Sequence, residues 1–416
     1  MSLSLLSSTS RVETPFIIVS IAGYTFGNYS AESRRKMQAG GYQMLASKFP
    51  NYMDSLTIEK VNGTVNTYTL TMIYAIREGD DPNLLEKVFS KAKNDRTIKI
   101  SYGDLSMPSF IYKEEEAIIS NITSDIDINS SVIRYTVSCV SKCLALAAGT
   151  YNFRKRVAKP SDVIKEILYN SSYGLLDVFY GMRDKEQVLA KGLILGDDKV
   201  VILDDKLNVT VLNYLSYLVA SMVNISESPT SISKKFTYGL VVRDDITSGW
   251  NGPYFQIVKV TASATADSID TYEIDIGYPN ENMVMSFSLD DNQSWSILYD
   301  YSGQIQQPDY RYIIDNQGNI QSEYSPTLAK SNTLLKMTQA DRTYWSNVTQ
   351  YPISATLTIK GLLRPAILMT YVKVNVLFYG QRHIASGYYV VTKQTDTINA
   401  SGYRTTLKLI RIRGVD

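Results

Sequence analysis

Two pairs of short segments recur in this chain in the same order, and this internal repeat constrains the fold more than any other feature of the sequence. The first pair matches Ile58–Val61 and Thr67–Tyr74 with Ile257–Val260 and Thr271–Tyr278. In each longer segment, apolar and polar residues alternate, which is the period of a strand with one buried face. Asn62-Gly63 between the first two segments is a hairpin turn signal. We therefore expect the same β-hairpin in both places.

The second pair of segments lies further along each copy. Ile128-Asn-Ser-Ser131, followed by Arg134, matches Ile398-Asn-Ala-Ser401, followed by Arg404, and every residue lies 270 positions after its counterpart. Strand-like alternation follows both segments. Two matched pairs in the same order indicate that one β unit has been duplicated along the chain.

The segments between the repeats predict helices. Asp81–Lys91 has an acidic residue and a proline in its first turn and then apolar residues at helical spacing. Its expected counterpart in the second copy is Ser331–Gln339. Further helices are expected over Lys159–Leu168 and Val209–Val223, with a short strand at Lys199–Leu203 between them.

The predicted fold is mainly β with an α+β insertion. It consists of two similar small β-barrel (tube-like) domains, of which the second is split by insertions. The first barrel domain is expected over residues 11–150. The inserted α/β domain is expected in two parts, 151–253 and 280–349, which pack together. The second barrel is then formed by a first hairpin at 254–279 and by the remainder at 350–416.

Composition argues against several classes of function. The 416 residues include 42 Lys and Arg against 41 Asp and Glu, so no net charge attracts the chain to nucleic acid or anionic membranes. The single histidine, His383, argues against Ser-His or Cys-His catalysis and against multi-histidine metal sites. Cys139 and Cys143 are interpreted as small buried apolar residues. The longest apolar helical segment, Val209–Val223, is too short to span a bilayer, and no secretion signal is recognised.

Acidic clusters are the remaining candidates for chemistry. Gly79-Asp-Asp81 and Gly196-Asp-Asp198 are similar to the metal-binding motif of polymerases, but both stand where turns or helix caps are expected. Glu114-Glu-Glu116 is interpreted as a solvated charge run on a strand edge. Catalysis on a glycosidic bond needs two carboxylates about 5–10 Å apart across a cleft, and neighbours in sequence do not supply that spacing. The pairs of this kind are Asp204-Asp205, Asp244-Asp245 and Asp290-Asp291. We therefore expect no catalytic residues, no metal ligands and no cofactor.

Short motifs in both copies carry a resemblance to one family. They are Asn62–Leu70 and Gly79–Ser90 in the first unit, and His383–Val391, Ile398 and Gly402–Leu409 at the end of the chain. Together with two barrel-like units, the second split by an insertion, these motifs are similar to the tail-hub family of bacteriophage baseplates. That family is shared with the spike proteins of type VI secretion and other contractile injection machines. It has no catalytic motif that could be transferred to this chain.

The resemblance implies a structural virion protein and not an enzyme. A hub of this family is a homotrimer that adapts the sixfold tail tube to a threefold central spike and forms part of the DNA-conducting channel. The implied partners are the tail tube protein and the central spike protein, with the tape measure and baseplate wedge proteins as further neighbours. DNA would pass through without specific binding. The implied location is the virion tail, assembled in the host cytoplasm; a phage-derived secretion particle fits equally.

Two other functions stay open at this point. A receptor- or glycan-binding tail protein would use exposed aromatic rings as stacking platforms, for which Trp250, Trp295 and Trp345 are the candidates. A cell-wall hydrolase component would need a pair of carboxylates facing each other across a cleft.

Overall fold

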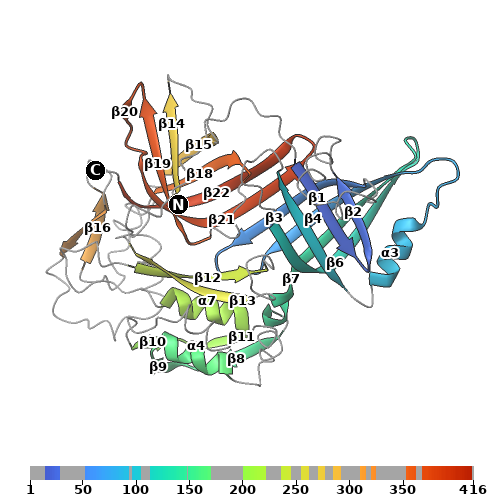
Figure 1. Ribbon diagram of the computed structural model, residues 1–416. Helices are drawn as coiled ribbons and strands as arrows, with labels where there is room; N and C mark the ends of the chain where they lie inside the picture. Colours follow the sequence, from blue (N-terminus) through green and yellow to red (C-terminus); the bar gives the residue numbers. More distant parts are fainter. Residues whose placement is uncertain are drawn as a thin grey trace.

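The computed structural model describes most of the chain and shows a mainly β protein (Figure 1). The described residues are 15–28, 52–92, 96–104, 113–147, 149–169, 200–221, 236–244, 254–261, 270–276, 284–291, 310–314, 320–324, 353–361 and 368–414. Several predicted features lie outside them: the helix at Ser331–Gln339, Gly196-Asp-Asp198, Asp245 and the three tryptophans.

Within its described residues, the first β unit contains an antiparallel run of strands and a helix. Its strands are β1 (Pro15–Ile21), β2 (Tyr24–Asn28), β3 (Met53–Val61), β4 (Thr67–Ala75), β5 (Thr97–Asp104), β6 (Lys113–Asp127) and β7 (Val132–Ser141). Hydrogen bonds join them in the order β3-β4-β7-β6-β5-β1-β2. The helix expected after Asp81 is α3 (Leu84–Ala92), which buries Leu85, Val88 and Phe89.

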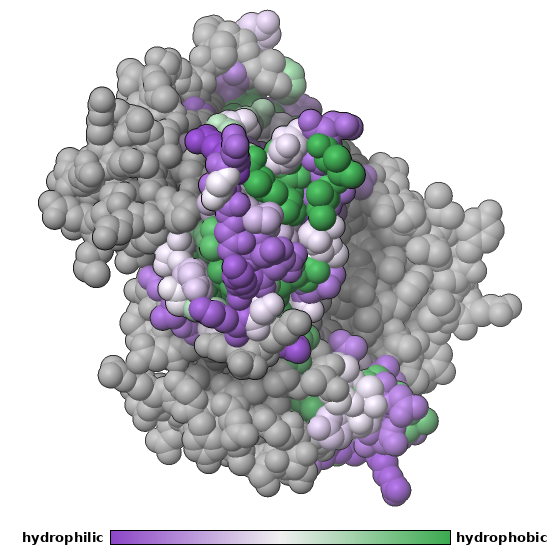
Figure 2. Space-filling view, turned by 90° about the vertical axis from the view of Figure 1, so that its right-hand side faces the viewer, coloured by the Kyte–Doolittle hydropathy of each residue, from purple (hydrophilic) through white to green (hydrophobic). Residues whose placement is uncertain are grey.

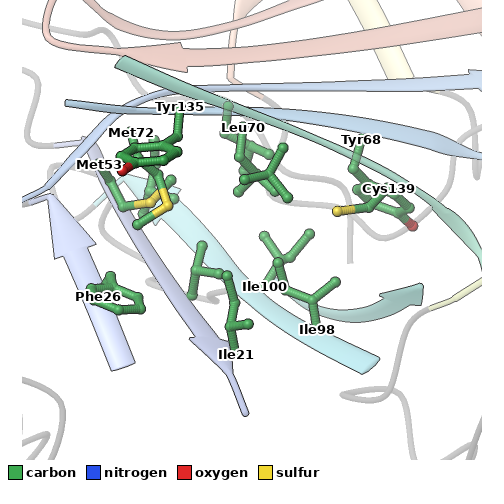
Figure 3. Close-up of a cluster of buried hydrophobic side chains, with 14 of the residues drawn as sticks. Ile21, Phe26, Met53, Tyr68, Leu70, Met72, Ile98, Ile100, Tyr135 and Cys139 are labelled. Carbon is green, nitrogen blue, oxygen red and sulfur yellow. The ribbon is translucent and has the colours of Figure 1, made fainter. Parts of the chain in front are cut away.

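The sheet of the first unit curls over its own core. Ile21 of β1 and Ile100 of β5 lie on one side, and they face Leu70, Met72 and Tyr135 from β4 and β7 on the other side (Figure 3). None of these side chains is more than 1% exposed. The alternation seen in the sequence of β4 is therefore the alternation of buried and outward-facing side chains.

The second unit continues the same sheet. Its strands are β14 (Asp270–Ile276), β15 (Val284–Asp291), β18 (Ile353–Lys360), β19 (Tyr371–Phe378), β20 (Gln381–Arg382), β21 (Gly387–Asn399) and β22 (Gly402–Gly414). They are joined in the order β15-β18-β22-β21, with β19 pairing the first part of β21. Because β21 also pairs with β3, the two units share one sheet.

The two units have the same strand order. In the first unit β3-β4-β7-β6-β5 are neighbours in this order, and in the second unit β15-β18-β22-β21-β19 are. Both closing hairpins also contain a bulge at the equivalent place, at Ser120 in β6 and at Thr392 in β21. The hydroxyl of Ser120 donates to the carbonyl of Ser138, and that of Thr392 donates to the carbonyl of Lys408. Ser138 and Lys408 are 270 positions apart, the offset found in the sequence.

The insertion packs helices against short two-stranded ribbons. Its elements are η1 (Lys142–Ala147), β8 (Thr150–Phe153), β9 (Arg156–Ala158), α4 (Pro160–Tyr169), β10 (Val201–Leu203), β11 (Lys206–Thr210), α7 (Val211–Ser221), β12 (Phe236–Arg243), β13 (Tyr254–Thr261), β16 (Tyr310–Ile314) and β17 (Ile320–Tyr324). The two expected helices and the strand between them are confirmed as α4, α7 and β10. In β12, Leu240 and Val242 join the core of the insertion, while Val241 joins the core of the second unit.

The structure corrects the first sequence match. The segments Ile257–Val260 and Thr271–Tyr278 were expected to pair as a hairpin, but β13 pairs with β12 and β14 pairs in parallel with β19. Alternating polarity marks a strand with one buried face, but it does not specify which strand lies beside it. Similarly, β15 falls in the segment expected within the insertion, but it pairs with β18 in the large sheet.

The two units were expected to be small β-barrels, and the described strands meet this expectation only in part. Among the described strands, the hydrogen-bonded order runs from β15 to β2 as an open path, and these strands form no closed barrel. Each unit is a curled sheet over its own apolar core in this part of the chain.

Candidate functional site

Four charged side chains are buried where the first unit, the insertion and the second unit meet. Lys60 lies on β3, Glu115 on β6, Asp244 directly after β12, and Asp396 on β21. None of the four is more than 2% exposed. A buried charge is costly unless it is paired or hydrogen-bonded, so the partners of these groups define what the cluster can do. We call this cluster the buried junction.

The first part of the buried junction is a paired lysine and glutamate. Lys60 Nζ lies 2.5 Å from Glu115 Oε1, and the hydroxyls of Tyr68 and Tyr102 donate to the same carboxylate at 2.6 and 2.7 Å. Burial alone raises the pKa of Glu115, but Lys60 and the two tyrosines outweigh it and hold this pKa below its ordinary value of 4.5. Glu115 is therefore ionised, with three donors around it.

Asp244 connects the insertion to the first unit through neutral hydrogen-bond donors. Its carboxylate accepts hydrogen bonds from Asn66 Nδ2 at 2.9 Å and from the Ser141 hydroxyl at 2.5 Å. The hydroxyl of Tyr68 is 2.9 Å from Asp244 Oδ2. Burial raises the pKa of Asp244 from 3.8 to about 6, and the charge of Glu115 acts in the same direction.

Asp396 forms the part of the buried junction that belongs to the second unit. It accepts hydrogen bonds from Gln394 Nε2 at 2.6 Å, Thr405 Oγ1 at 2.5 Å and the Tyr403 hydroxyl at 3.1 Å. The ring of Tyr403 lies edge-on to the ring of Tyr102, with 6.1 Å between the ring centres. Asp396 thus lies beside the first unit although its hydrogen-bond partners come from its own hairpin.

The turn between β3 and β4 attaches the insertion just beside these charges. Gly63 N donates to the carbonyl of Leu240 at 2.8 Å, and Leu240 N donates to Asn62 Oδ1 at 2.9 Å. Ser216 of α7 donates to the Gly63 carbonyl at 2.8 Å. Gly63 has φ +78°, and a Cβ there would lie 3.1 Å from Ser216 Oγ. The Asn-Gly signal therefore supplies both a turn and a close contact with the insertion.

The sequence interpretation of Glu114-Glu-Glu116 was wrong for its central residue. Glu115 is buried, and Glu116 is half-buried beside Lys142 and Lys99. The physical reason is parity, since Glu115 has the same side-chain direction as Ala117, which faces the core. Lys60 has the parity of the buried Ile58 in the same way. Two opposite charges at inward-facing positions were the signal that could have revealed the pair.

The other acidic candidates have local structural roles. Asp80 accepts from Arg77 N, and Asp81 accepts from Asn83 N ahead of α3, as expected for a turn and a helix start. Asp205 accepts from Lys155 N within the insertion. Asp290 lies exposed near the end of β15.

Cys139, Cys143 and His383 also lie in the described part of the chain. Cys139 and Cys143 are buried free thiols whose pKa is raised by burial. His383 lies in the exposed turn between β20 and β21.

In the described residues, no group of three or more His, Cys, Asp or Glu side chains has an arrangement suited to a metal ion. The carboxylates of the buried junction are covered by protein and occupied by protein donors, so their chemistry is to hold chain segments together and to bind protons. None of the helices in the described ranges is long and apolar enough to cross a membrane.

Among the strand edges that lack a neighbour in the described part of the chain, two lie on β6 and on β15, outside the buried junction. Beyond Ser120, β6 pairs only with β7 among the described strands, because β5 begins at Thr97, opposite Ile118. β15 pairs only with β18. Both edges carry exposed apolar side chains: Ile126 is 64% exposed, and Met285 is 50% exposed. Figure 2 views the end of the molecule that carries α3 and the tip of the β6–β7 hairpin, where apolar surface lies among hydrophilic side chains.

No protein-family model and no curated protein sequence matches this chain. Among solved structures, the chain is similar to phage tail proteins. A tail protein from Neisseria meningitidis is 9% identical, with 95% of this chain and 96% of that chain covered and a TM-score of 0.47. A prophage tail protein from Shewanella oneidensis is 10% identical, with 95% and 98% covered and a TM-score of 0.46.

A chain of the Francisella PdpA–VgrG complex is also similar, at 10% identity and a TM-score of 0.45. In that case 97% of this chain matches 59% of the longer one. Identities and TM-scores at this level describe a likeness in chain arrangement and assign no activity or partner.

Proposed function

We propose that this chain is a structural subunit of the hub of a phage tail baseplate or of a related injection particle, and that it works as a homotrimer. The observation that supports this proposal best is the repeated strand order, β3-β4-β7-β6-β5 and β15-β18-β22-β21-β19. A chain with two like units forms a ring of six like units when three copies assemble. Such a ring matches a threefold partner on one face and a sixfold partner on the other.

The contact between the two units within one chain suggests how copies would join. The far half of β21 pairs with β3, from Lys393 opposite Val61 to Ile398 opposite Leu56. The equivalent half of β6 lacks this neighbour among the described strands, and β15, the equivalent of β3, lacks one on its outer side. We propose that β6 of one copy pairs with β15 of the next copy. This head-to-tail contact covers the open edges of both β6 and β15 once the ring is closed.

The register of this contact follows from the repeat. In the first unit, the register pairs Leu56 of β3 with Leu70 of β4, and Leu70 with Val137 of β7. In the second unit, it pairs Phe287 of β15 with Leu357 of β18, and Leu357 with Leu407 of β22. Phe287 therefore occupies the place of Leu56. The partner of Leu56 is Ile398, whose equivalent on β6 is Ile126, so Ile126 would face Phe287 of the neighbouring copy. One step along the same face, Ser124 would face Leu289.

In this proposal the ring lies between the tail tube protein and the central spike protein, with the tape measure and baseplate wedge proteins as further neighbours. The near-neutral chain suits a channel that DNA passes without being held, since no overall positive charge attracts the phosphates. The proposed location is the tail of the virion, after assembly in the host cytoplasm. No catalytic role is proposed.

The experiment is directed cross-linking of the purified full chain. Ser124→Cys combined with Leu289→Cys places two thiols at facing positions of neighbouring copies, within the Cα spacing that a disulfide requires. Oxidation should give covalent species up to three chains, and electron images should show a ring with six similar lobes. In the matched control, Leu289 is kept and Ser288→Cys is used, because the side chain of Ser288 points to the opposite face of the sheet.

A native trimer that gives no cross-link with the first pair, or equal cross-linking with both pairs, would reject this strand contact. A chain that stays monomeric and binds glycan by itself would instead support the receptor-binding function. The tryptophans considered for that role lie outside the described residues.

A further inference from the structure

If every carboxyl group of the buried junction is ionised, too few hydrogen atoms lie around Asp244 to place one between each pair of facing oxygens. Tyr68 Oη lies 2.6 Å from Glu115 Oε2 and 2.9 Å from Asp244 Oδ2. A phenol carries one hydrogen, so it can donate to only one of the two carboxylates. The other carboxylate oxygen would then face a lone pair of the phenol oxygen without a hydrogen between them.

The remaining groups around Asp244 do not supply the missing hydrogen. Asn66 from the β3–β4 turn and Ser141 from the end of β7 already donate to it. The thiol of Cys143 on η1 is close enough for the charge of Asp244 to raise its pKa. The charge of Asp244 also acts on Lys60 of β3, but the salt bridge of Lys60 is to Glu115 on β6.

A second observation indicates the same shortage of hydrogens. Asn66 is fully buried, and its Oδ1 accepts no hydrogen bond from any described group. A buried carbonyl without a donor is uncommon, because its desolvation is not repaid. The carboxyl group of Asp244 therefore lies beside a phenol with one hydrogen for two carboxylates, and beside an amide whose oxygen has no donor.

We infer that Asp244 carries a proton in the folded protein and donates it to Tyr68, which in turn donates to Glu115, so that the insertion is attached to the first β unit through a proton-binding contact. In this arrangement each short oxygen–oxygen distance contains one hydrogen. Asp244 directly follows β12, and its own carbonyl accepts from Glu116 N at 3.2 Å. Loss of the proton would leave two carboxylates facing one phenol at the place where β12 contacts the sheet.

The sign of the pH effect follows from the raised pKa of Asp244, which is about 6 in the folded chain against an ordinary value of 3.8. The folded chain holds this proton more tightly than the unfolded chain. The stabilisation is thus fully present below about pH 4 and is lost as the pH rises through about 6. Between pH 5 and pH 7.5, this group alone increases the unfolding equilibrium constant about tenfold.

The first test is urea unfolding of the full chain at pH 5 and pH 7.5, with two variants. Asp244→Asn keeps a hydrogen-bond donor at every pH. In this variant, the increase of the unfolding constant from pH 5 to pH 7.5 should be about tenfold smaller than in the wild type. Glu116→Gln is the matched control, since Glu116 is a neighbouring carboxyl whose pKa is lowered, and it should leave this dependence as in the wild type. An unchanged pH dependence in Asp244→Asn would overturn the inference.

The second test uses the wild-type chain and does not depend on whether a variant folds. Amide hydrogen exchange is followed at Gly63, which donates to Leu240 of β12, and at Glu116, which donates to Asp244 directly after β12. After correction for the intrinsic effect of pH, exchange at these two amides should increase between pH 5 and pH 7.5. Ile73 N, which donates to Tyr52 within the first unit, is the internal control and should not change. Equal behaviour of all three amides would overturn the proton-binding contact and leave the proposed trimer untouched.

Discussion

The hairpins β6–β7 and β21–β22 have the same construction and opposite surroundings. Each has a bulge whose hydroxyl residue, Ser120 or Thr392, donates to the facing strand. Each also has a side chain that holds the turn, since Asp127 accepts from Asn129 N and Asn399 accepts from Ser401 N. The far half of β21 is nevertheless buried against β3, whereas the far half of β6 is exposed.

This difference separates local from non-local causes. Turn and bulge depend on residues close in sequence, so both copies retain them. Burial depends on which strand lies alongside, and only the second hairpin has that neighbour within the described chain. The side chains differ in the same way. On the far half of β21, Asp396 is buried together with its hydrogen-bond partners, whereas Ile126 on the far half of β6 is exposed.

The largest effect on the free energy of unfolding is expected on β3, the strand that pairs with the far half of β21. Lys60→Met leaves Glu115 as a buried carboxylate without its cation, and this should lower the free energy of unfolding by about 3–5 kcal/mol. The double variant with Glu115→Gln removes both charges and should recover much of that loss. Urea unfolding of the single and double variants measures it. If the double variant were no more stable than the single one, the pairing of these charges would not explain the loss.

The next effect on stability compares the two isoleucines that match in the sequence repeat, Ile398 on β21 and Ile128 in the turn after β6. Ile398 is 1% exposed and Ile128 is 87% exposed. Ile398→Ala should cost about 2–4 kcal/mol because it leaves a cavity in the core. Ile128→Ala should change the free energy of unfolding by less than about 0.5 kcal/mol. Similar losses for the two variants would mean that the hairpins do not differ in burial as described.

The smallest effect on the free energy of unfolding is expected at the bulges, a feature that both hairpins share. Ser120→Ala and Thr392→Val each remove the hydroxyl that bridges a bulge to the facing strand. Each should cost about 0.5–1 kcal/mol, the usual net value of one hydrogen bond. Thermal unfolding of both variants checks this. A loss at one bulge only would show that the two bulges are not equivalent.

Much of the local structure could be predicted from the sequence. The helices α3, α4 and α7 lie where apolar spacing and first-turn residues placed them. The hairpin closed by Ile398–Ser401 was found from its match with Ile128–Ser131. The hairpin expected from Ile257–Val260 was not formed, because an alternating pattern is common to all half-buried strands and identifies no partner.

The buried junction shows why the candidate site was the hardest part to predict. Lys60 and Glu115 are 55 positions apart, and Asp244 is more than 100 positions further along. Each looks like an ordinary polar residue beside other polar residues in the sequence. Only the parity of Glu115 with Ala117 hinted at its burial.

The sequence by itself determined where strands, turns and helices form and that a β unit is repeated, because these depend on side-chain periodicity and on residues within a few positions. The tertiary structure decided which edges are covered, which charges are buried together and where the insertion is attached. Those outcomes depend on groups distant in sequence being removed from water at the same place. A charge becomes costly there, and a hydrogen bond or a proton becomes necessary, only once the surrounding segments have packed.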